Sequence, residues 1–117
     1  MQDFIIKYSK QCMKERQAML KTDKTADNGK YVFVLEGRLD TNSAEKMEAE
    51  LQPCMSDAKE LIFDFEKLQY ISSAGLRILL SAQKTMNRQG TMKILHVNET
   101  IMNIFEVTGF TDILTIE

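Results

Sequence analysis

Apolar side chains recur along the chain at two spacings, one typical of β-strands and one typical of α-helices. Three runs have the β-branched and aromatic character of buried strands, namely residues 31–35, 61–65 and 92–97. Three other stretches repeat apolar residues every three or four positions, as a helix with one buried face requires, namely residues 42–53, 73–90 and 98–109. Short outer strands are expected at residues 19–22 and 113–116. The pattern therefore predicts an α/β fold, a mixed β-sheet of about five strands with three to four helices.

Turn and capping residues indicate where these elements begin and end. The Asn-Gly pair at residues 28–29 is a strong signal for a hairpin turn between the first two strands. Asn42, with Glu45 three residues later, is expected to start the first helix through a capping box. Pro53, the only proline, is expected to mark where that helix ends or frays.

The most informative stretch joins the strand at residues 61–65 to the helix that follows it. Residues 66–73 are mostly charged or polar and are expected to form a loop that ends at Ser72 and Ser73. A serine just before a helix accepts a hydrogen bond from a free backbone N–H, and Gly90 is expected to close the helix in a left-handed conformation. The two serines therefore lie at the positive end of a helix dipole, where added negative charge is tolerated.

The sequence Tyr-Ile-Ser-Ser-Ala-Gly-Leu-Arg at residues 70–77 resembles the signature of the STAS domains of the anti-sigma factor antagonist family. The resemblance extends to residues 35–40 and 107–110, so it covers nearly all of the chain from about Met19. It implies the mixed sheet and helices of a STAS domain. In that family the phosphorylated serine lies two residues before the glycine, which corresponds to Ser73. Ser72 is the alternative, and it occupies a position that is often Asp in the family.

The resemblance implies a bacterial regulatory binding protein and not an enzyme. Its unphosphorylated form would bind an anti-sigma factor that is a serine kinase, and so free a sigma factor for transcription. The kinase would phosphorylate the serine, and a serine phosphatase would reverse the reaction. The alternative is a STAS scaffold or a transporter-associated regulatory subunit that binds its partner without phosphorylation. No cofactor and no metal is implied.

Partner contacts are expected where the strands end, because functional loops of such sheets gather at the carboxyl ends of the strands. The residues expected to contact the partner are Arg38, Asp40, Ser72, Ser73, Leu76 and Arg77. Asp64 also follows a strand, and a structural role is favoured for it. A serine-hydrolase function is not supported, since the Gly-x-Ser-x-Gly pattern is absent and His96 is the only histidine.

Composition narrows the class of protein further. With 44% hydrophobic residues in 117, the chain is long enough for one domain with a single core. A formal net charge of −2, with acidic and basic residues interspersed, does not favour nucleic acid as a partner. No apolar run approaches the roughly 20 residues of a membrane span, and no signal peptide is recognised. Cys12 and Cys54 lack zinc-ligand spacing and are expected to be free thiols in the cytoplasm.

Residues 1–18 are expected to be an extension, with a short helix, that precedes a STAS domain at residues 19–117. Because the sheet can be assembled from Met19 onward, deletion of residues 1–12 is expected to leave the thermal unfolding transition cooperative and close to that of the full chain. Circular dichroism during heating measures this. A truncated chain that is unfolded or aggregated would show that the extension supplies part of the core.

Overall fold

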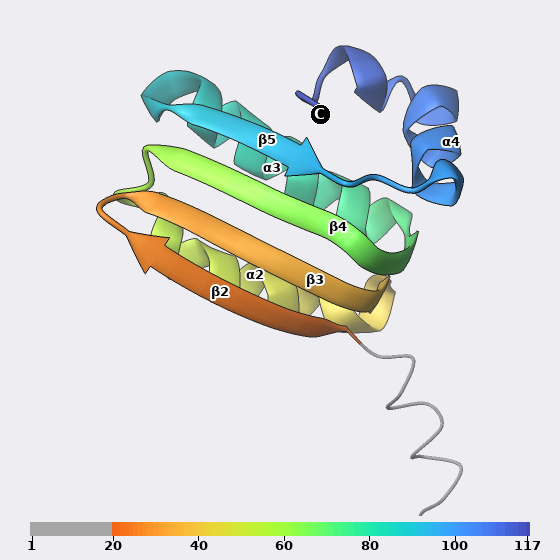
Figure 1. Ribbon diagram of the computed structural model, residues 1–117, viewed down its shortest axis with the longest axis horizontal. Coiled ribbons are helices and arrows are strands. Elements are labelled where there is room, and N and C mark those ends of the chain that lie inside the picture. Colours follow the sequence, from red (N-terminus) through yellow and green to blue (C-terminus); the bar gives the residue numbers. More distant parts are fainter. Residues whose placement is uncertain (1–19) are drawn as a thin grey trace, which may run out of the picture.

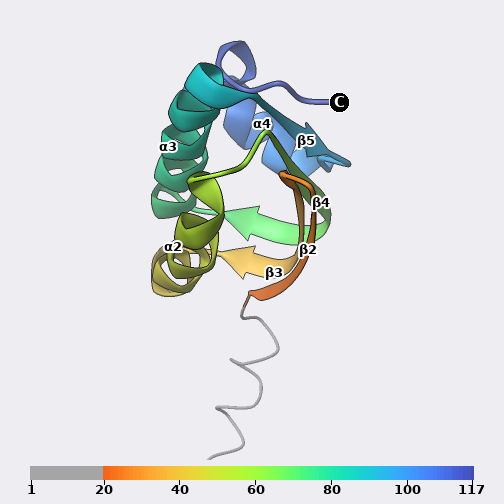
Figure 2. The ribbon, with the colours of Figure 1, turned by 90° about the vertical axis from the view of Figure 1, so that its left-hand side faces the viewer.

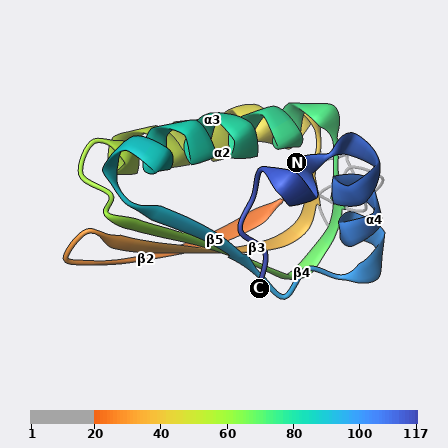
Figure 3. The ribbon, with the colours of Figure 1, turned by 90° about the horizontal axis from the view of Figure 1, so that it is seen from above.

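The computed structural model describes residues 20–117, which form a four-stranded sheet with two helices on one face and a third helix at one end (Figures 1 and 3). The elements in chain order are β2 (Lys21–Asp27), β3 (Lys30–Leu39), α2 (Thr41–Met55), β4 (Glu60–Ile71), α3 (Ser73–Gln89), β5 (Thr91–Leu95), α4 (Glu99–Thr108) and the short 3-10 helix η1 (Phe110–Asp112). The strands lie in the order β2-β3-β4-β5. The pair β2–β3 is antiparallel and the other two pairs are parallel. The predicted α/β fold with a mixed sheet is confirmed.

The outer parts of the sheet differ from the prediction. The first described strand, β2, spans Lys21–Asp27 and not residues 19–22. The predicted strand at residues 113–116 is reduced to one parallel bridge between Ile116 and Ile94, so the described residues contain four strands and not five. The hairpin turn is confirmed, because Asn28 and Gly29 both have positive φ, at 52° and 84°. The predicted helix at residues 1–18 and Cys12 lie outside the described residues.

The core lies between the sheet and the pair of helices α2 and α3, which cover the same face (Figure 2). Phe33, Phe63 and Phe65 project from the strands into this layer and are almost completely buried. Their rings lie next to one another, with centroids 5.7 Å and 6.2 Å apart. The helices contribute buried side chains at the predicted spacing, including Met47 and Leu79. Burial of each such side chain stabilises the fold by about 1.5–3 kcal/mol.

Strand β4 is much longer than the sequence pattern predicts, because residues 66–71 continue the strand instead of forming a loop. Two irregularities in the β3–β4 register each place one extra β4 residue opposite β3. The inward side chains therefore fall at Phe65, Leu68 and Ile71, three residues apart, and all three are buried. This spacing breaks the alternation of apolar and polar residues by which a strand is recognised in sequence. The exposed Glu66 and Lys67, between Phe65 and Leu68, therefore resemble a loop.

Two helix ends also differ from the prediction. Helix α2 continues through Pro53 to Met55, so the proline lies in the last turn and does not end the helix. Gly90, after α3, has φ −179° and not the predicted left-handed conformation. A glycine is needed there because a Cβ would collide with the backbone carbonyl of Lys59. The same carbonyl accepts a hydrogen bond from the Thr91 N–H at 3.0 Å, which brings the end of α3 close to the start of β4.

The first turn of α3 lies directly against the ends of β3 and β4. A Cβ on Gly75 would lie 2.7 Å from Cγ1 of Ile71 and 2.8 Å from Cγ of Leu39, both in buried side chains. Contacts this short do not occur between carbon atoms in a relaxed core. The glycine therefore sets how closely α3 approaches the sheet.

We expect Gly75→Ala to destabilise the domain by about 1–3 kcal/mol, because the added methyl group overpacks the core. Urea unfolding followed by circular dichroism measures the change, with Lys84→Ala at an exposed position of α3 as the control. In an open helix the same Gly→Ala change would stabilise the protein by about 1 kcal/mol. A stabilised Gly75→Ala variant would therefore contradict the close packing.

Candidate functional site

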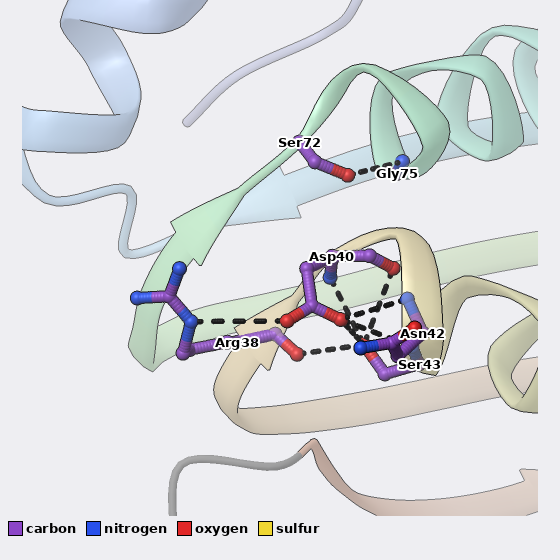
Figure 4. Close-up of polar contacts among 6 residues, drawn as sticks. All are labelled: Arg38, Asp40, Asn42, Ser43, Ser72 and Gly75. Atoms are coloured by element: carbon purple, nitrogen blue, oxygen red, sulfur yellow. Dashed lines mark hydrogen bonds and ion pairs between the residues drawn. The ribbon is translucent and has the colours of Figure 1, made fainter.

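Two strand-to-helix junctions lie side by side at one end of the sheet (Figure 4). Strands β3 and β4 are parallel neighbours that end together, with Leu39 paired to Ile71. The Ser72 N–H donates a hydrogen bond to the Leu39 carbonyl at 2.9 Å, so the junctions are joined through the backbone. Asp40 then caps the start of α2 and Ser72 caps the start of α3, each in an extended conformation. Two helix N-termini, both with free N–H groups and a positive dipole end, are thus brought together.

The two neighbouring serines have different roles. Ser72 is the N-cap of α3, and its Oγ accepts a hydrogen bond from the Gly75 N–H at 3.5 Å (Figure 4). Ser73 is the first residue of the helix and is exposed. Among the described residues, the Ser73 hydroxyl has no hydrogen-bond partner. The capping function therefore belongs to Ser72, which leaves the Ser73 hydroxyl accessible.

Asp40, and not Asn42, caps helix α2. Its Oδ1 accepts hydrogen bonds from the N–H groups of Asn42 at 3.1 Å and Ser43 at 3.0 Å. The Asp40 N–H donates in return to Oγ of Ser43 at 2.9 Å, which completes a capping box. The predicted box between Asn42 and Glu45 is wrong because the helix begins at Thr41, two residues earlier than that box requires.

Arg38 is held at the end of β3 by two neighbours. Its Nε lies 3.8 Å from Oδ2 of Asp40, and its guanidinium lies 4.4 Å from the centre of the Tyr70 ring on β4. The side chain is 42% exposed, so the pair with Asp40 contributes little to stability but orients the arginine. Arg38 and Asp40 are therefore available at the surface beside Ser72, as the sequence predicts (Figure 4).

Beside the Ser73 end, a groove of about 390 Å³ runs between α2 and α3. Its walls are formed by Thr41, Ala44, Glu45 and Glu48 of α2 and by Ala74, Arg77, Ile78 and Ser81 of α3. The predicted partner residue Arg77 is exposed and lines this groove. The predicted partner residue Leu76 is instead 7% exposed and packs in the core, which leaves it almost no surface for a partner.

The acidic wall of the groove was missed by the sequence analysis. Glu45 and Glu48 lie three residues apart on α2, on either side of the buried Met47. At this spacing they share a helix face next to the apolar stripe, and that is the signal from which the wall could have been predicted.

Asp64 connects two parts of the fold through hydrogen bonds. Its Oδ1 accepts hydrogen bonds from the Glu66 N–H and from Nδ1 of His96, both at 3.0 Å. Burial opposes ionisation of Asp64, but the hydrogen bond from His96 and that from the Glu66 N–H outweigh it and lower the pKa. The same hydrogen bond, with the charge of Asp64, raises the pKa of His96. The pair joins β4 to the segment that follows β5.

Comparison with known proteins places the chain in a family. Residues 20–117, which include both junctions and the serines, match the family profile of the STAS domain. The chain belongs to the STAS domain family. It is similar to BtrV of Bordetella bronchiseptica, a candidate anti-sigma factor antagonist, with 31% identity over 91 residues that cover 76% of this chain and 78% of the relative.

Solved structures share the fold of this STAS domain at lower sequence identity. An anti-sigma factor antagonist from Mycobacterium paratuberculosis has a TM-score of 0.76 at 17% identity, covering 85% of this chain and 86% of that one. The Bacillus cell fate determinant SpoIIAA in its phosphorylated form has a TM-score of 0.65 at 19% identity, covering 84% and 90%. Within residues 20–117, this STAS domain has no helix long and apolar enough to cross a bilayer.

The single histidine of the STAS domain provides a direct test of the Asp64–His96 pair. We expect the pKa of His96 to exceed its ordinary value of about 6.5, and Asp64→Asn to return it toward that value. Proton NMR of the imidazole ring during a pH titration measures both. A wild-type pKa of about 6.5 or lower, or one that Asp64→Asn leaves unchanged, would contradict the contact.

The pair also predicts the direction of a pH effect on stability. The raised pKa of His96 means that its charged form stabilises the folded protein. This stabilisation is complete at a pH below the pKa of His96 in the unfolded chain, and it is lost as the pH rises through the pKa of His96 in the folded protein. The lowered pKa of Asp64 means that its ionised form stabilises the folded protein. This stabilisation is complete at a pH above the pKa of Asp64 in the unfolded chain, and it is lost as the pH falls through the pKa of Asp64 in the folded protein. The pair therefore stabilises the fold most at mildly acidic pH, between these two transitions.

Proposed function

We propose that this STAS domain is an anti-sigma factor antagonist whose binding to a serine-kinase anti-sigma factor is switched off by phosphorylation of Ser73. The proposal is supported by family membership and by the similarity to BtrV. It depends on one structural observation, the exposed hydroxyl of Ser73 at the first position of α3. The domain would act in the cytoplasm by binding, without catalysis of its own, and a serine phosphatase would restore the free serine.

Accessibility favours Ser73 over Ser72 as the phosphorylated residue. A kinase must reach the hydroxyl with the γ-phosphate of ATP in line, so the acceptor has to be exposed. Ser72 is only partly exposed and its Oγ caps the helix, whereas Ser73 is exposed and makes no capping bond. Phosphorylation of Ser73 would leave the cap intact.

Charge provides the switch. A phosphate adds about −1.5 to −2 charges at pH 7 and three acceptor oxygens. The first turn of α3 tolerates this charge, because of the dipole and the free N–H groups. Arg77, four residues after Ser73 on the same helix, is at the spacing for an ion pair with the phosphate. The fold would therefore remain intact while the surface presented to the partner becomes more negative.

The proposed partner surface combines the serine end with the groove between α2 and α3. It consists of Arg38, Asp40, Ser72, Ser73 and Arg77, with Glu45 and Glu48 along the acidic wall. In the free domain Arg77 is the basic residue that lines this groove. A phosphate on Ser73 would neutralise Arg77 and leave the acidic wall unbalanced. A docked partner would then have to desolvate an excess of negative charge, which weakens binding.

Serine variants test the switch. We expect Ser73→Ala to abolish phosphorylation by the partner kinase with ATP and to retain kinase binding. It should change stability by no more than about 0.5 kcal/mol, since Ser73 is not the cap. Ser73→Asp should bind the kinase about 2 kcal/mol more weakly, because a charge buried without a partner destabilises the interface. Intact-mass analysis, peptide mapping and isothermal titration calorimetry measure these outcomes.

Ser72→Ala is the matched control. It removes the cap and is expected to destabilise the domain by about 0.5–2 kcal/mol while Ser73 is still phosphorylated. Phosphate found on Ser72 would move the assignment by one residue. Tight kinase binding without any phosphorylation would instead support the scaffold or transporter-associated alternative. Equal kinase affinity of Ser73→Ala and Ser73→Asp would rule out a charge switch.

A further inference from the structure

A second cluster of chemically reactive side chains lies away from the serine end. Asp64, Glu66 and His96 each offer one ligand atom, and these atoms all lie within 4.8 Å of one another. Asp64 is on β4 between the inward-facing Phe63 and Phe65, so it faces the side of the sheet opposite α2 and α3. His96 immediately follows β5, whose last residue, Leu95, is paired with Asp64. The cluster is therefore created by strand pairing.

We propose that Asp64, Glu66 and His96 form a binding site for a divalent first-row transition-metal ion such as Zn²⁺. Imidazole nitrogen with carboxylate oxygens is a ligand set that suits Zn²⁺ better than Mg²⁺ or Ca²⁺, which prefer oxygen ligands alone. Three protein ligands leave the remaining coordination positions to water, as in open zinc sites. No metal was expected from the sequence, because the ligands come from β4 and from the residue after β5, about 30 residues apart, and have no local motif.

The geometry requires only a small adjustment to hold an ion. Ligand atoms bound at about 2.0–2.2 Å to one tetrahedral metal ion lie roughly 3.3–3.6 Å apart. Asp64 Oδ1 and His96 Nδ1 are already separated by 3.0 Å. Because a proton now lies between these two atoms, the metal would replace it. The Glu66 carboxylate is on an exposed side chain, which is free to turn toward the ion.

Backbone features hold two of the ligands in place. The Glu66 N–H donates to Asp64 and fixes the carboxylate, and this kind of second contact orients metal ligands. His96 has a positive φ of 60° at the first residue after β5. The charge of Lys67 lies near Asp64 and opposes a cation, so affinity is expected to be moderate. A bound ion would link β4 to the segment that leads into α4.

Zn²⁺ titrated into the full reduced chain, followed by calorimetry, tests the site. The wild-type chain is expected to bind one ion at this site, and His96→Asn, Asp64→Asn and Glu66→Gln each to weaken that binding about tenfold or more. Asparagine is chosen at position 96 because it tolerates the positive φ. Glu48→Gln, an exposed carboxylate on the groove wall of α2, is the matched control and should leave binding unchanged.

The NMR signals of the His96 ring should shift or broaden on metal addition, which locates the ion independently of the affinity. Loss of binding only in His96→Asn would show capture by a lone imidazole and overturn the three-ligand site. Equal loss in Glu48→Gln, or no change at the His96 ring, would overturn it too. Because the cluster is separate from Ser73, these results do not bear on the proposed phosphorylation switch.

Discussion

The parallel pairing of β3 with β4 up to their last residues is the constraint on which the rest of the site depends. Leu39 lies opposite Ile71, and the Ser72 N–H extends the ladder by one more bond to Leu39. Gly75 then allows α3 to pack directly on this pair. Helices α2 and α3 therefore both begin at the same end of the sheet, and their N-termini lie close together there. Two positive dipole ends at one place favour anionic groups, and the carboxylate of Asp40 already occupies one of them.

The elements whose signals are local were predictable from the sequence. The hairpin turn at residues 28–29, the helix that buries Met47 and Leu51, and the apolar strand at residues 61–65 follow from turn chemistry and periodicity. The end of β4 was not predictable in this way. Each irregularity there arises from the pairing of β4 with β3. Because these strands are distant in the chain, their pairing produces no periodic pattern of apolar residues in either sequence.

The candidate site shows the same division. Arg38, Asp40, Ser72 and Arg77 were placed at one end of the sheet because they follow strands or open a helix, and the structure has them there. Leu76 was misplaced, because a helical repeat shows which residues share a face but not which neighbour covers that face. The Asp64–His96 contact could not be foreseen for a similar reason, since it requires knowledge that β4 and β5 are neighbours.

Strand β2 lies at the outer edge of the described sheet, paired on one side only (Figure 1). Open strand edges offer backbone groups to other chains, and they are the usual starting point for sheet-to-sheet aggregation. Charged residues occupy four of the seven positions of β2, namely Lys21, Asp23, Lys24 and Asp27. Because these charged side chains are hydrated, pairing of a strand from another chain with β2 is unfavourable. The composition of β2 thus disfavours the addition of another chain at this edge of the described sheet.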